Sequence, residues 1–501
     1  MAIPKVFGIE TEYGISGIGR RDFNPVVASS LLIAGYAGDL RRIRWDYEQE
    51  SPLRDARGGG SPLVRDMGDD DAGLANVILP NGARYYVDHA HPEYSTPECA
   101  SPRELVVHDR AGERILEASL LAFEATLPAG ARVGIYKNNS DGKGNSYGTH
   151  ENYLVAREVP FGDLARDLIP FLVSRQVVTG AGKVGSEADG DADRAPRYQL
   201  TQRADFFETE VGLETTLKRP IVNTRDEPHA DPDRYRRLHV IVGDANLCEV
   251  ASLLKIGTAS LVLRMIEDAF LPDLSLEAPV AALRRISADP TCRERVALRD
   301  GRRLTAVQLQ WEYLERAVKY VEQEGAAEGD EEVLARWEDV LGRLEEDPAS
   351  LHRELDWVAK LRLLEGYRER DGLDWRDPKL RLVDLQYHDV RRDRGLYHRL
   401  AASGAVERVT TDDEIERAID GPPASTRAWF RGECVRRFPD QVVAASWDSL
   451  IVDTGGRALQ RIPMREPLRG TRAHVGALLD GVGDAAGLVA ALAGGQGAGA
   501  R

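Results

Sequence analysis

Residues 81–99 read NGARYYVDHAHPEYSTPEC, and this stretch decides how the chain folds. Successive side chains of a β-strand point to opposite faces, so a strand here would carry Arg84, Tyr86 and Asp88 on one face. A solvent-facing strand can carry a cation, a phenol and a carboxylate side by side without any function. Other segments must therefore decide whether this polar face lines a site.

The composition bounds the class of protein. The 501 residues are 42% hydrophobic, enough for a sizeable core and for more than one domain. The formal net charge of -16 argues against a nucleic-acid binder, because such proteins turn a cationic surface toward phosphates. No window approaches the roughly 20 apolar residues that span a bilayer, and the N-terminal MAIPKVFGIETEYG lacks the features of a signal peptide. We therefore expect a cytoplasmic protein.

The four cysteines are scattered without a C-x-x-C pair, at Cys99, Cys248, Cys292 and Cys434. This spacing indicates neither a zinc ribbon nor a disulfide framework. Because a free cysteine behaves as a small hydrophobe, we expect buried, reduced thiols.

Strand-like segments dominate the first half of the chain and long helical patterns the second, an order typical of the α+β class. Apolar residues recur at steps of three and four from Ala306, behind a possible Thr305 cap, and again from Val333, which predicts two amphipathic helices. The segment from Glu249 is apolar on most sides and predicts a buried helix behind the sheet.

Stretches rich in glycine, proline and charged residues predict the domain boundaries of the chain. Residues 38–74 combine glycines, prolines and dense charge, so we expect a mobile insertion there. The dipeptide Pro422-Pro423 precedes a short helical pattern and strand-like pieces. We predict a large domain over 1–423, a small C-terminal domain over 424–487 and a flexible tail over 488–501.

The first strand-like segment carries two carboxylates. In GIETEYGIS at residues 8–16, Glu10 and Glu12 would share one strand face, roughly 7 Å apart. Carboxylates at that spacing repel each other unless cations lie near them, and Mg²⁺ prefers carboxylate oxygens. The alternative is two solvated glutamates on an exposed face.

Two further strand-like segments carry imidazoles. Alternation places His150 on one face with Asn152, and His239 on one face with Arg237. A lone histidine on a strand is usually a hydrogen-bonded structural residue. A mixed carboxylate and imidazole metal site would form, however, if one sheet face gathered both histidines with Glu10, Glu12, Glu93 and Glu98.

An arginine pair offers a site for phosphate. Arg219 and Arg225 flank Asn223 in an extended segment, and guanidinium groups match phosphate oxygens better than lysine does. Both are candidates for nucleotide binding. The alternative is a pair of surface arginines that bind Asp226 and Glu227.

Several other sequence motifs do not meet the requirements of the sites that they resemble. TGAGKVGSE resembles a P-loop, but Val177 stands where the first glycine is required and Val184 replaces the Ser or Thr that holds magnesium. His89 and His91 beside Asp88 could bind zinc, but no third ligand follows at the usual spacing. No G-x-S-x-G nucleophile elbow is present, which argues against a serine hydrolase.

Taken together and in order, these segments resemble a known family along nearly the whole chain. The motifs are GIETEYG, NGARYYVD followed by HPEYSTPEC, KNNSDGKGNSYGTHENYL, RPIVNTRDEPHADPDRYRRLHVIVGDAN and LVDLQYHD. They resemble the family of Pup ligases and depupylases, which is related to glutamine synthetases. The resemblance implies a curved, mainly antiparallel sheet that cradles ATP and magnesium, backed by helices, with a small C-terminal domain.

The resemblance also implies residue roles. It implies that Asp88 is the catalytic aspartate and that Glu10 is a magnesium ligand. The other implied positions are Arg84, Thr96 and Trp447 for ATP, and Tyr86, Glu93, His150 and His239 for the metal. Glu12, Arg219 and Arg225 are our additions from strand parity and charge.

Two features resemble the hydrolytic, depupylase branch of the family: the insertion at 38–74 and the spacing of HAHPEY after Asp88. That branch would deamidate the C-terminal Gln of Pup and cleave the isopeptide bond between Pup and a target lysine, with Mg-ATP as cofactor. The expected partners are Pup and pupylated proteins, and we expect a monomer. A Pup ligase that consumes ATP and a non-catalytic Pup- or nucleotide-binding regulator are the alternatives.

Overall fold

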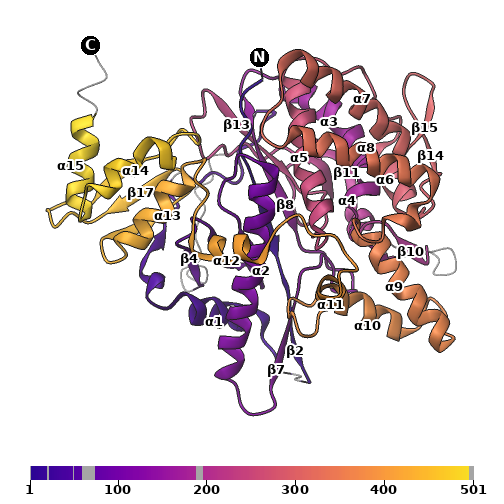
Figure 1. Ribbon diagram of the computed structural model, residues 1–501, viewed down its shortest axis with the longest axis horizontal. Coiled ribbons are helices and arrows are strands. Elements are labelled where there is room, and N and C mark those ends of the chain that lie inside the picture. Colours follow the sequence, from indigo (N-terminus) through magenta and orange to yellow (C-terminus); the bar gives the residue numbers. More distant parts are fainter. Residues whose placement is uncertain (1, 20–21, 49, 59–73, 188–195, 496–501) are drawn as a thin grey trace.

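The computed structural model describes residues 2–19, 22–48, 50–58, 74–187 and 196–495 (Figure 1). At its centre lies a six-stranded sheet in the order β13-β8-β1-β6-β5-β4. Every neighbouring pair in this sheet is antiparallel. The strands are β1 (Phe7–Glu12), β4 (Asn76–Ile78), β5 (Arg84–Asp88), β6 (His91–Ser95), β8 (Thr149–Ala156) and β13 (Tyr235–Val240). The predicted α+β class, with a mainly antiparallel sheet, is confirmed.

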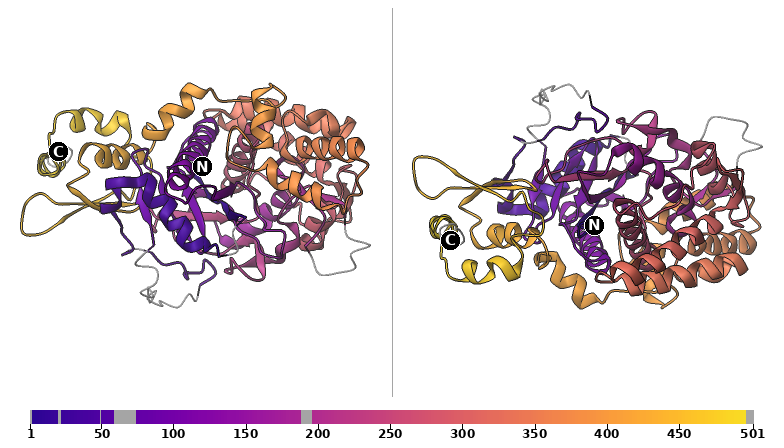
Figure 2. Two further views of the ribbon diagram at one scale, coloured as in Figure 1. Left: turned by 90° about the horizontal axis from the view of Figure 1, so that it is seen from below. Right: turned by 90° about the horizontal axis from the view of Figure 1, so that it is seen from above.

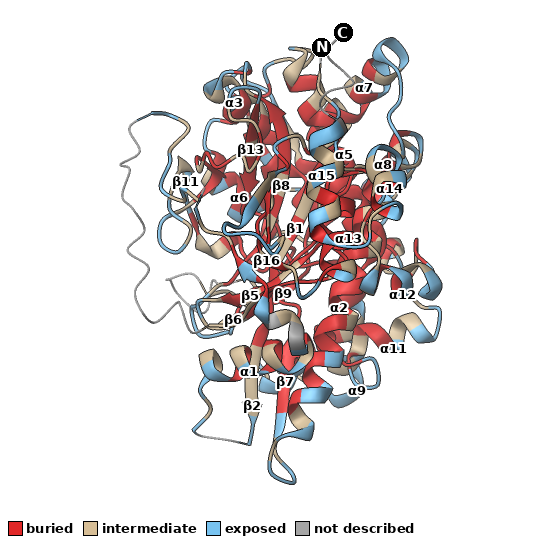
Figure 3. Cartoon of the chain, turned by 90° about the vertical axis from the view of Figure 1, so that its left-hand side faces the viewer, coloured by how far each residue is buried: buried red, intermediate tan, exposed pale blue. Residues whose placement is uncertain are grey.

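One face of this sheet is apolar and packs on helices. Its side chains include Ile9, Tyr85, Tyr94, Tyr153 and Leu238, all almost fully buried. The helices against it include α2 (Pro102–Ala125) and α5 (Glu249–Glu267), and α5 is the buried helix that the sequence predicted. Figure 3 shows buried residues concentrated in the sheet and in these helices. The opposite face of the sheet is therefore the one left for polar residues.

A helical layer continues from α5 at one end of the molecule (Figures 1 and 2). The two predicted amphipathic helices are α7 (Ala306–Glu324) and α8 (Asp330–Glu346), and Thr305 caps α7 in a capping box with Gln308. Other helices of the described residues before residue 421 are α1 (Pro25–Ala37), α3 (Phe161–Ser174), α4 (Gln176–Thr179), α6 (Pro279–Ser287), α9 (Asp356–Asp371), α10 (Pro378–Tyr387), α11 (Leu396–Ala402) and α12 (Asp412–Asp420), with the 3-10 helices η3 (Ala204–Phe206) and η4 (Pro348–Leu351).

Among the described residues, four small two-stranded sheets lie outside the central sheet. They pair β2 (Gly14–Ile18) with β7 (Arg132–Tyr136), β9 (Lys183–Val184) with β10 (Tyr198–Gln199), β11 (Phe207–Gly212) with β12 (Arg219–Asn223), and β14 (Arg295–Ala297) with β15 (Arg303–Thr305). The four cysteines are buried and free, as predicted. Among the described residues, no helix has the length and apolar character needed to cross a membrane.

A small module lies at the opposite end of the molecule (Figures 1 and 2). It has a hydrophobic core of its own, in which Trp429, Phe430 and Leu450 meet Ile43 and Trp45 from early in the chain. Its four-stranded sheet runs in the order β18-β17-β16-β3. Its elements are α13 (Ala428–Arg437), β16 (Val442–Ala445), β17 (Ser449–Val452), β18 (Gln460–Pro463), α14 (Arg472–Asp480), α15 (Ala485–Gly495) and the early strand β3 (Arg44–Trp45).

The predicted mobile insertion at 38–74 is wrong for its described part, while residues 59–73 lie outside the described residues. Residues Gly38–Arg42 form the 3-10 helix η1, and β3 pairs in parallel with β16 of the small module. Ile43 is 1% exposed and Trp45 is 6% exposed. The segment is so rich in charged residues that its two apolar side chains were overlooked. The burial of these two side chains stabilises the position of the segment.

The flexible tail predicted for 488–501 is also wrong in part. Helix α15 extends to Gly495, and Leu488 is fully buried in the core of the small module. Alanine and leucine favour helix more strongly than the scattered glycines oppose it. Residues 496–501 lie outside the described residues, and the division of the chain at residue 423 stays a prediction.

Candidate active site

The polar face of the central sheet gathers residues from four strands in register. Arg84 of β5 lies opposite Ser95 of β6, which lies opposite Glu10 of β1, which lies opposite His150 of β8. One step along, Tyr86, Glu93 and Glu12 form a second row. His239 of β13 joins the face opposite Asn152. The alternation read from the sequence thus places all these side chains on one surface.

A cavity of about 540 Å³ lies over this face. It is lined by residues of the sheet, of the segment after β3, of the loops around β12 and of the small module. Its predicted site residues are Glu10, Arg84, Tyr86, Asp88, Glu93, His150, Arg225, His239 and Trp447. Nine of the predicted side chains therefore share one space.

One corner of the cavity could hold a cation. Glu10, His150 and His239 each offer a ligand atom, and these atoms lie within 4.8 Å of one another. Glu10 Oε2 lies 3.6 Å from His150 Nδ1, and Glu10 Oε1 accepts a hydrogen bond from Asn152 Nδ2 at 2.8 Å. Burial alone would raise the pKa of Glu10, but His150, His239 and Arg237 hold it well below its ordinary value. The carboxylate is therefore charged and available to a metal.

The second carboxylate, Glu93, lies near several other carboxylates. It is 2% exposed, and Tyr86 Oη donates to its Oε1 at 2.5 Å. Burial, followed by the nearby charges of Asp88, Glu10 and Glu12, raises the pKa of Glu93 well above its ordinary value. A divalent cation between these carboxylates would relieve that repulsion, so the donor set fits magnesium.

Asp88 ends β5 at the wall of the same cavity. Burial favours its neutral form, but a hydrogen bond from His89 Nδ1 to Asp88 Oδ2 at 2.8 Å, together with the charges of His89, His150 and Arg84, lowers the pKa of Asp88. The carboxylate is consequently ionised at neutral pH. It can act there as a nucleophile or as a base.

The arginines Arg84 and Arg225 of the cavity have different surroundings. The Arg84 guanidinium lies 3.9 Å from the ring centroid of Trp45 and 3.8 Å from that of Tyr86, and its Nε donates to Asn76 Oδ1 at 3.1 Å. Arg225 has a buried Nε without a hydrogen-bond partner among the described residues. Burial and the neighbouring Arg237 lower the pKa of Arg225. Its Nε can therefore donate to a phosphate oxygen.

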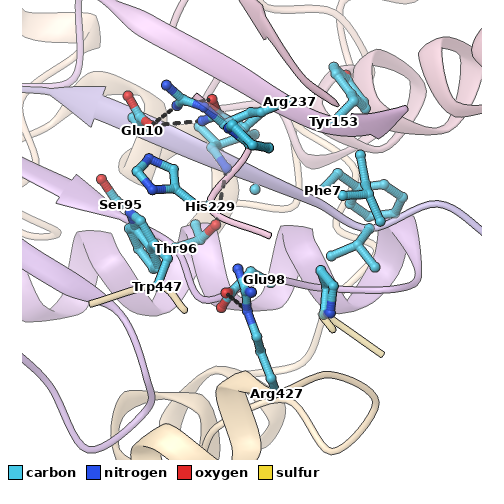
Figure 4. A pocket seen from close by; sticks show the side chains of 17 residues that line it. Phe7, Glu10, Ser95, Thr96, Glu98, Tyr153, His229, Arg237, Arg427 and Trp447 are labelled. Carbon is cyan, nitrogen blue, oxygen red and sulfur yellow. Dashed lines mark hydrogen bonds and ion pairs between the residues drawn. The ribbon is translucent and has the colours of Figure 1, made fainter. Parts of the chain in front are cut away.

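A second cavity, of about 80 Å³, adjoins the first and shares Glu10, His229, Arg237 and Trp447 with it. Figure 4 shows Arg237 joined to Glu10 on one side of it and Arg427 joined to Glu98 on the other. Thr96 lines this smaller cavity rather than the larger one, and its Oγ1 accepts a hydrogen bond from Ile9 N at 3.0 Å. Phe7, Ile9, Tyr153 and Leu154 give this cavity a mainly apolar lining.

Two predicted residues do not line either cavity. Glu12 accepts a hydrogen bond from Gly148 N at 2.8 Å and groups with Asp88 and His89, its ligand atom within 4.8 Å of theirs. Arg219 donates to the carbonyls of Thr215 and Ser146, each at 2.8 Å. Arg219 points elsewhere because β12 pairs with β11 outside the central sheet. A role for Arg219 in nucleotide binding stays a prediction.

Among the residues of the larger cavity that sequence reasoning missed are Glu50, Glu227, His229 and Arg237. Arg237 Nη1 donates to Asn152 Oδ1 at 2.8 Å and lies 3.5 Å from Glu10 Oε1, so it links two strands beside the cation corner. The alternation that places His239 on the polar face includes Arg237, and this signal could have identified it. The other three come from segments without regular alternation.

Comparison with known proteins assigns the chain to a family. Residues 5–451 match the profile of the family described as Pup-ligase protein. The chain is a member of the Pup-ligase family. This confirms the resemblance read from the sequence motifs.

The relatives of this Pup-ligase family member cover nearly its whole length. The depupylase of Acidothermus cellulolyticus is 58% identical over 98% of this chain and 100% of its own length. The Pup deamidase/depupylase of Mycolicibacterium smegmatis is 54% identical over 97% of this chain and 99% of its own.

Two solved structures of the ligase PafA share the fold. The complex between Prokaryotic Ubiquitin-like Protein Pup and PafA has a TM-score of 0.81 at 33% identity, and covers 99% of this chain and 93% of that chain. PafA in complex with ADP has a TM-score of 0.73 at 39% identity, and covers 81% and 89%.

Proposed function

We propose that this protein is a depupylase and deamidase. It converts the C-terminal Gln of Pup to Glu, and it hydrolyses the isopeptide bond between that Glu side chain and a lysine of a pupylated protein. The observation that carries this proposal is the position of the Asp88 carboxyl group in the same cavity as the cluster of Glu10, His150 and His239. Relatives at 54% and 58% identity are named for these two activities.

Both substrates present the same γ-carbonyl carbon, so a single site serves both. In one route, Asp88 takes a proton from water while the water oxygen bonds to this carbon, and the amine then leaves with that proton as the C–N bond breaks. In the other, Asp88 attacks the carbon, the amine leaves with a proton from water, and a second water opens the mixed anhydride. The position of Asp88 supports either route.

A magnesium nucleotide completes the site in this proposal. Glu10, His150 and His239, with Glu93 and Tyr86 beside them, would hold Mg²⁺, while Arg84 and Arg225 would bind phosphate. The smaller cavity, lined by Thr96 and Trp447, suits the base, and the ADP complex of PafA supports a nucleotide in this fold. When bound, Mg²⁺ supplies positive charge to the oxyanion that develops on the substrate, an effect worth about 3 kcal/mol per preorganised group.

Hydrolysis of an amide is downhill and needs no energy from ATP. The nucleotide is therefore a lasting component of the site rather than a co-substrate consumed in each turnover. Counting nucleotide hydrolysed against isopeptide bonds cleaved tests this, and one fresh ATP per bond would overturn it. We propose that the enzyme acts on Pup in the cytoplasm.

The Pup ligase is the second candidate, because the two solved structures described above are of a ligase. The decisive experiment mixes the protein with ATP, Mg²⁺ and Gln-ended Pup, and follows the conversion of amide to acid by mass spectrometry. We expect conversion by the wild type, none by Asp88→Asn, and normal conversion by Asp413→Asn, which alters an exposed aspartate. Release of Pup from a purified conjugate separates the hydrolase from the ligase. Conjugation without release or deamidation would overturn the proposal.

A further inference from the structure

The residue that follows Asp88 in sequence also contacts its side chain. His89 lines the larger cavity, and its Nδ1 lies 2.8 Å from Asp88 Oδ2. A carboxylate oxygen accepts hydrogen bonds and an imidazole N–H donates them, so Nδ1 is the donor to Oδ2. No hydrogen bond between described residues engages the other carboxylate oxygen, Oδ1. The imidazole thus occupies one oxygen of Asp88 and leaves the other for chemistry.

The backbone at this position is strained. His89 has φ of 51° and stands first in the two-residue turn between β5 and β6, after the Asp88–His91 pair. Hairpin turns of this length favour Gly, Asn or Asp where φ is positive, because these residues adopt it at less cost than others. Glycine would adopt the backbone conformation of this turn at a lower free-energy cost than histidine does. Strain of this kind clusters at active sites and binding sites.

The surroundings hold the turn in one place. Ser29 Oγ of α1 donates to the carbonyl of Ala90 at 2.9 Å. On the other side, the His91 ring packs on Tyr147 with centroids 4.4 Å apart. With both flanks held, the backbone of the turn places the His89 side chain beside Asp88, and although this side chain is 66% exposed, its contact with Oδ2 holds the ring there.

We propose that His89 is a positioning residue for the hydrolysis, whose Nδ1–H holds Oδ2 of Asp88 so that Oδ1 faces the substrate carbonyl. This rests on the proposed function. The role is the same whether Oδ1 attacks the carbonyl carbon or takes a proton from water, because both routes need one carboxylate oxygen in a set direction. His89 does not touch the substrate in this proposal, so it acts on the rate of the step rather than on binding.

Three substitutions separate this role from a structural one. His89→Gly removes the donor and relieves the backbone. His89→Asn keeps a donor at the position of Nδ1 and tolerates positive φ. His89→Gln moves the donor one bond further out. Ala269→Gly is the matched control, because Ala269 also has φ of 51° and is exposed after α5, outside the site.

We expect His89→Gly and His89→Gln to lower kcat for Gln-ended Pup by about 10- to 100-fold with little change in KM, and His89→Asn to keep most of the activity. Scanning calorimetry should show a higher Tm for both His89→Gly and Ala269→Gly, because each relieves the same strain. Ala269→Gly should have wild-type kcat. His89→Gly would then be a more stable and less active enzyme, which a purely structural role does not produce.

The outcomes distinguish the two proposals. Wild-type kcat in His89→Gly, or a loss in His89→Asn as large as in His89→Gly, would overturn the positioning role and leave the proposed function intact. A wild-type protein that converts neither Gln-ended Pup nor a conjugate would overturn both.

Discussion

Arg427, at the start of α13, donates a hydrogen bond from Nε to Oε1 of Glu98 at 2.8 Å, across 329 residues of sequence. Arg431 of the same helix binds the other carboxylate oxygen. Burial opposes the charge of Glu98, but these two guanidinium groups lower its pKa to about 2. This triad fastens the small module to the chain just after β6, beside the smaller cavity.

Replacing Glu98 should therefore loosen the small module. Glu98→Gln leaves two buried guanidinium groups without a counter-charge, which we expect to cost about 3–5 kcal/mol in the free energy of unfolding. Nucleotide affinity should fall as well, because Glu98, Arg427 and Trp447 line the smaller cavity. Urea denaturation and ADP titration measure the two effects.

The control for this prediction lies in the same module. Asp480 pairs with Arg437 at 2.8 Å, but its side chain is 71% exposed. Asp480→Asn should cost at most about 1 kcal/mol and leave ADP affinity unchanged. Equal losses for the two variants would contradict a special role for Glu98.

Arg84 should depend on its aromatic neighbours for nucleotide binding. Trp45→Ala removes one of two rings that hold the guanidinium in place, an interaction worth about 0.5–2 kcal/mol. We expect weaker ADP binding in Trp45→Ala, and a larger loss in Arg84→Lys because the paired hydrogen bonds of arginine disappear. Isothermal titration calorimetry checks both. Arg44→Lys, at an exposed neighbour on β3, should bind ADP normally, and an unchanged Kd for Arg84→Lys would count against phosphate binding there.

Divalent cations should stabilise the protein through Glu10. A ligand that binds only the folded state raises Tm in proportion to the logarithm of its concentration above Kd. We therefore expect Mg²⁺ to raise Tm and a chelator to lower it, and expect Glu10→Gln to lose most of this response. Glu416→Gln, an exposed substitution on α12, should keep it. A full response in Glu10→Gln would show that the stabilising cation binds somewhere else.

His108 should make the protein sensitive to mild acid. Burial on α2 lowers the pKa of His108 to about 3. Below pH 6.5 the unfolded chain binds a proton that the folded protein excludes, so the free energy of unfolding falls by about 1.4 kcal/mol per pH unit down to pH 3. His108→Leu should flatten this part of the stability profile. His474→Leu, at an exposed position of α14, should leave it unchanged, and an equal slope in wild type and His108→Leu would refute the assignment.

Strand parity predicted the polar face of the sheet well. Arg84, Tyr86 and Asp88 lie together on it, as do Glu10 and His150, because alternation is a local property that tertiary contacts rarely overturn. The helices α5, α7 and α8 were predicted for the same reason, since their apolar residues keep a regular helical spacing.

Non-local features could not be predicted in this way. Arg219 has the residue type and neighbours of a phosphate ligand, but the partner of its strand decides where it points. Glu98 was a candidate for the metal site, yet two arginines more than 300 residues away take up its charge. The described part of the insertion was predicted as mobile because its composition is polar, whereas two buried side chains, Ile43 and Trp45, decide its structure.

The row of Arg84, Ser95, Glu10 and His150 has a consequence for how preparations of this enzyme are judged. If any one of these strands slipped by a single residue, its polar side chains would turn into the apolar layer and its apolar ones would take their place. A mispaired molecule would lose all the polar groups of the slipped strand together rather than one by one, and with them the complete site. Specific activity would therefore count correctly assembled molecules, and a partly misfolded sample should contain fully competent and wholly inert enzyme rather than a uniformly weakened population.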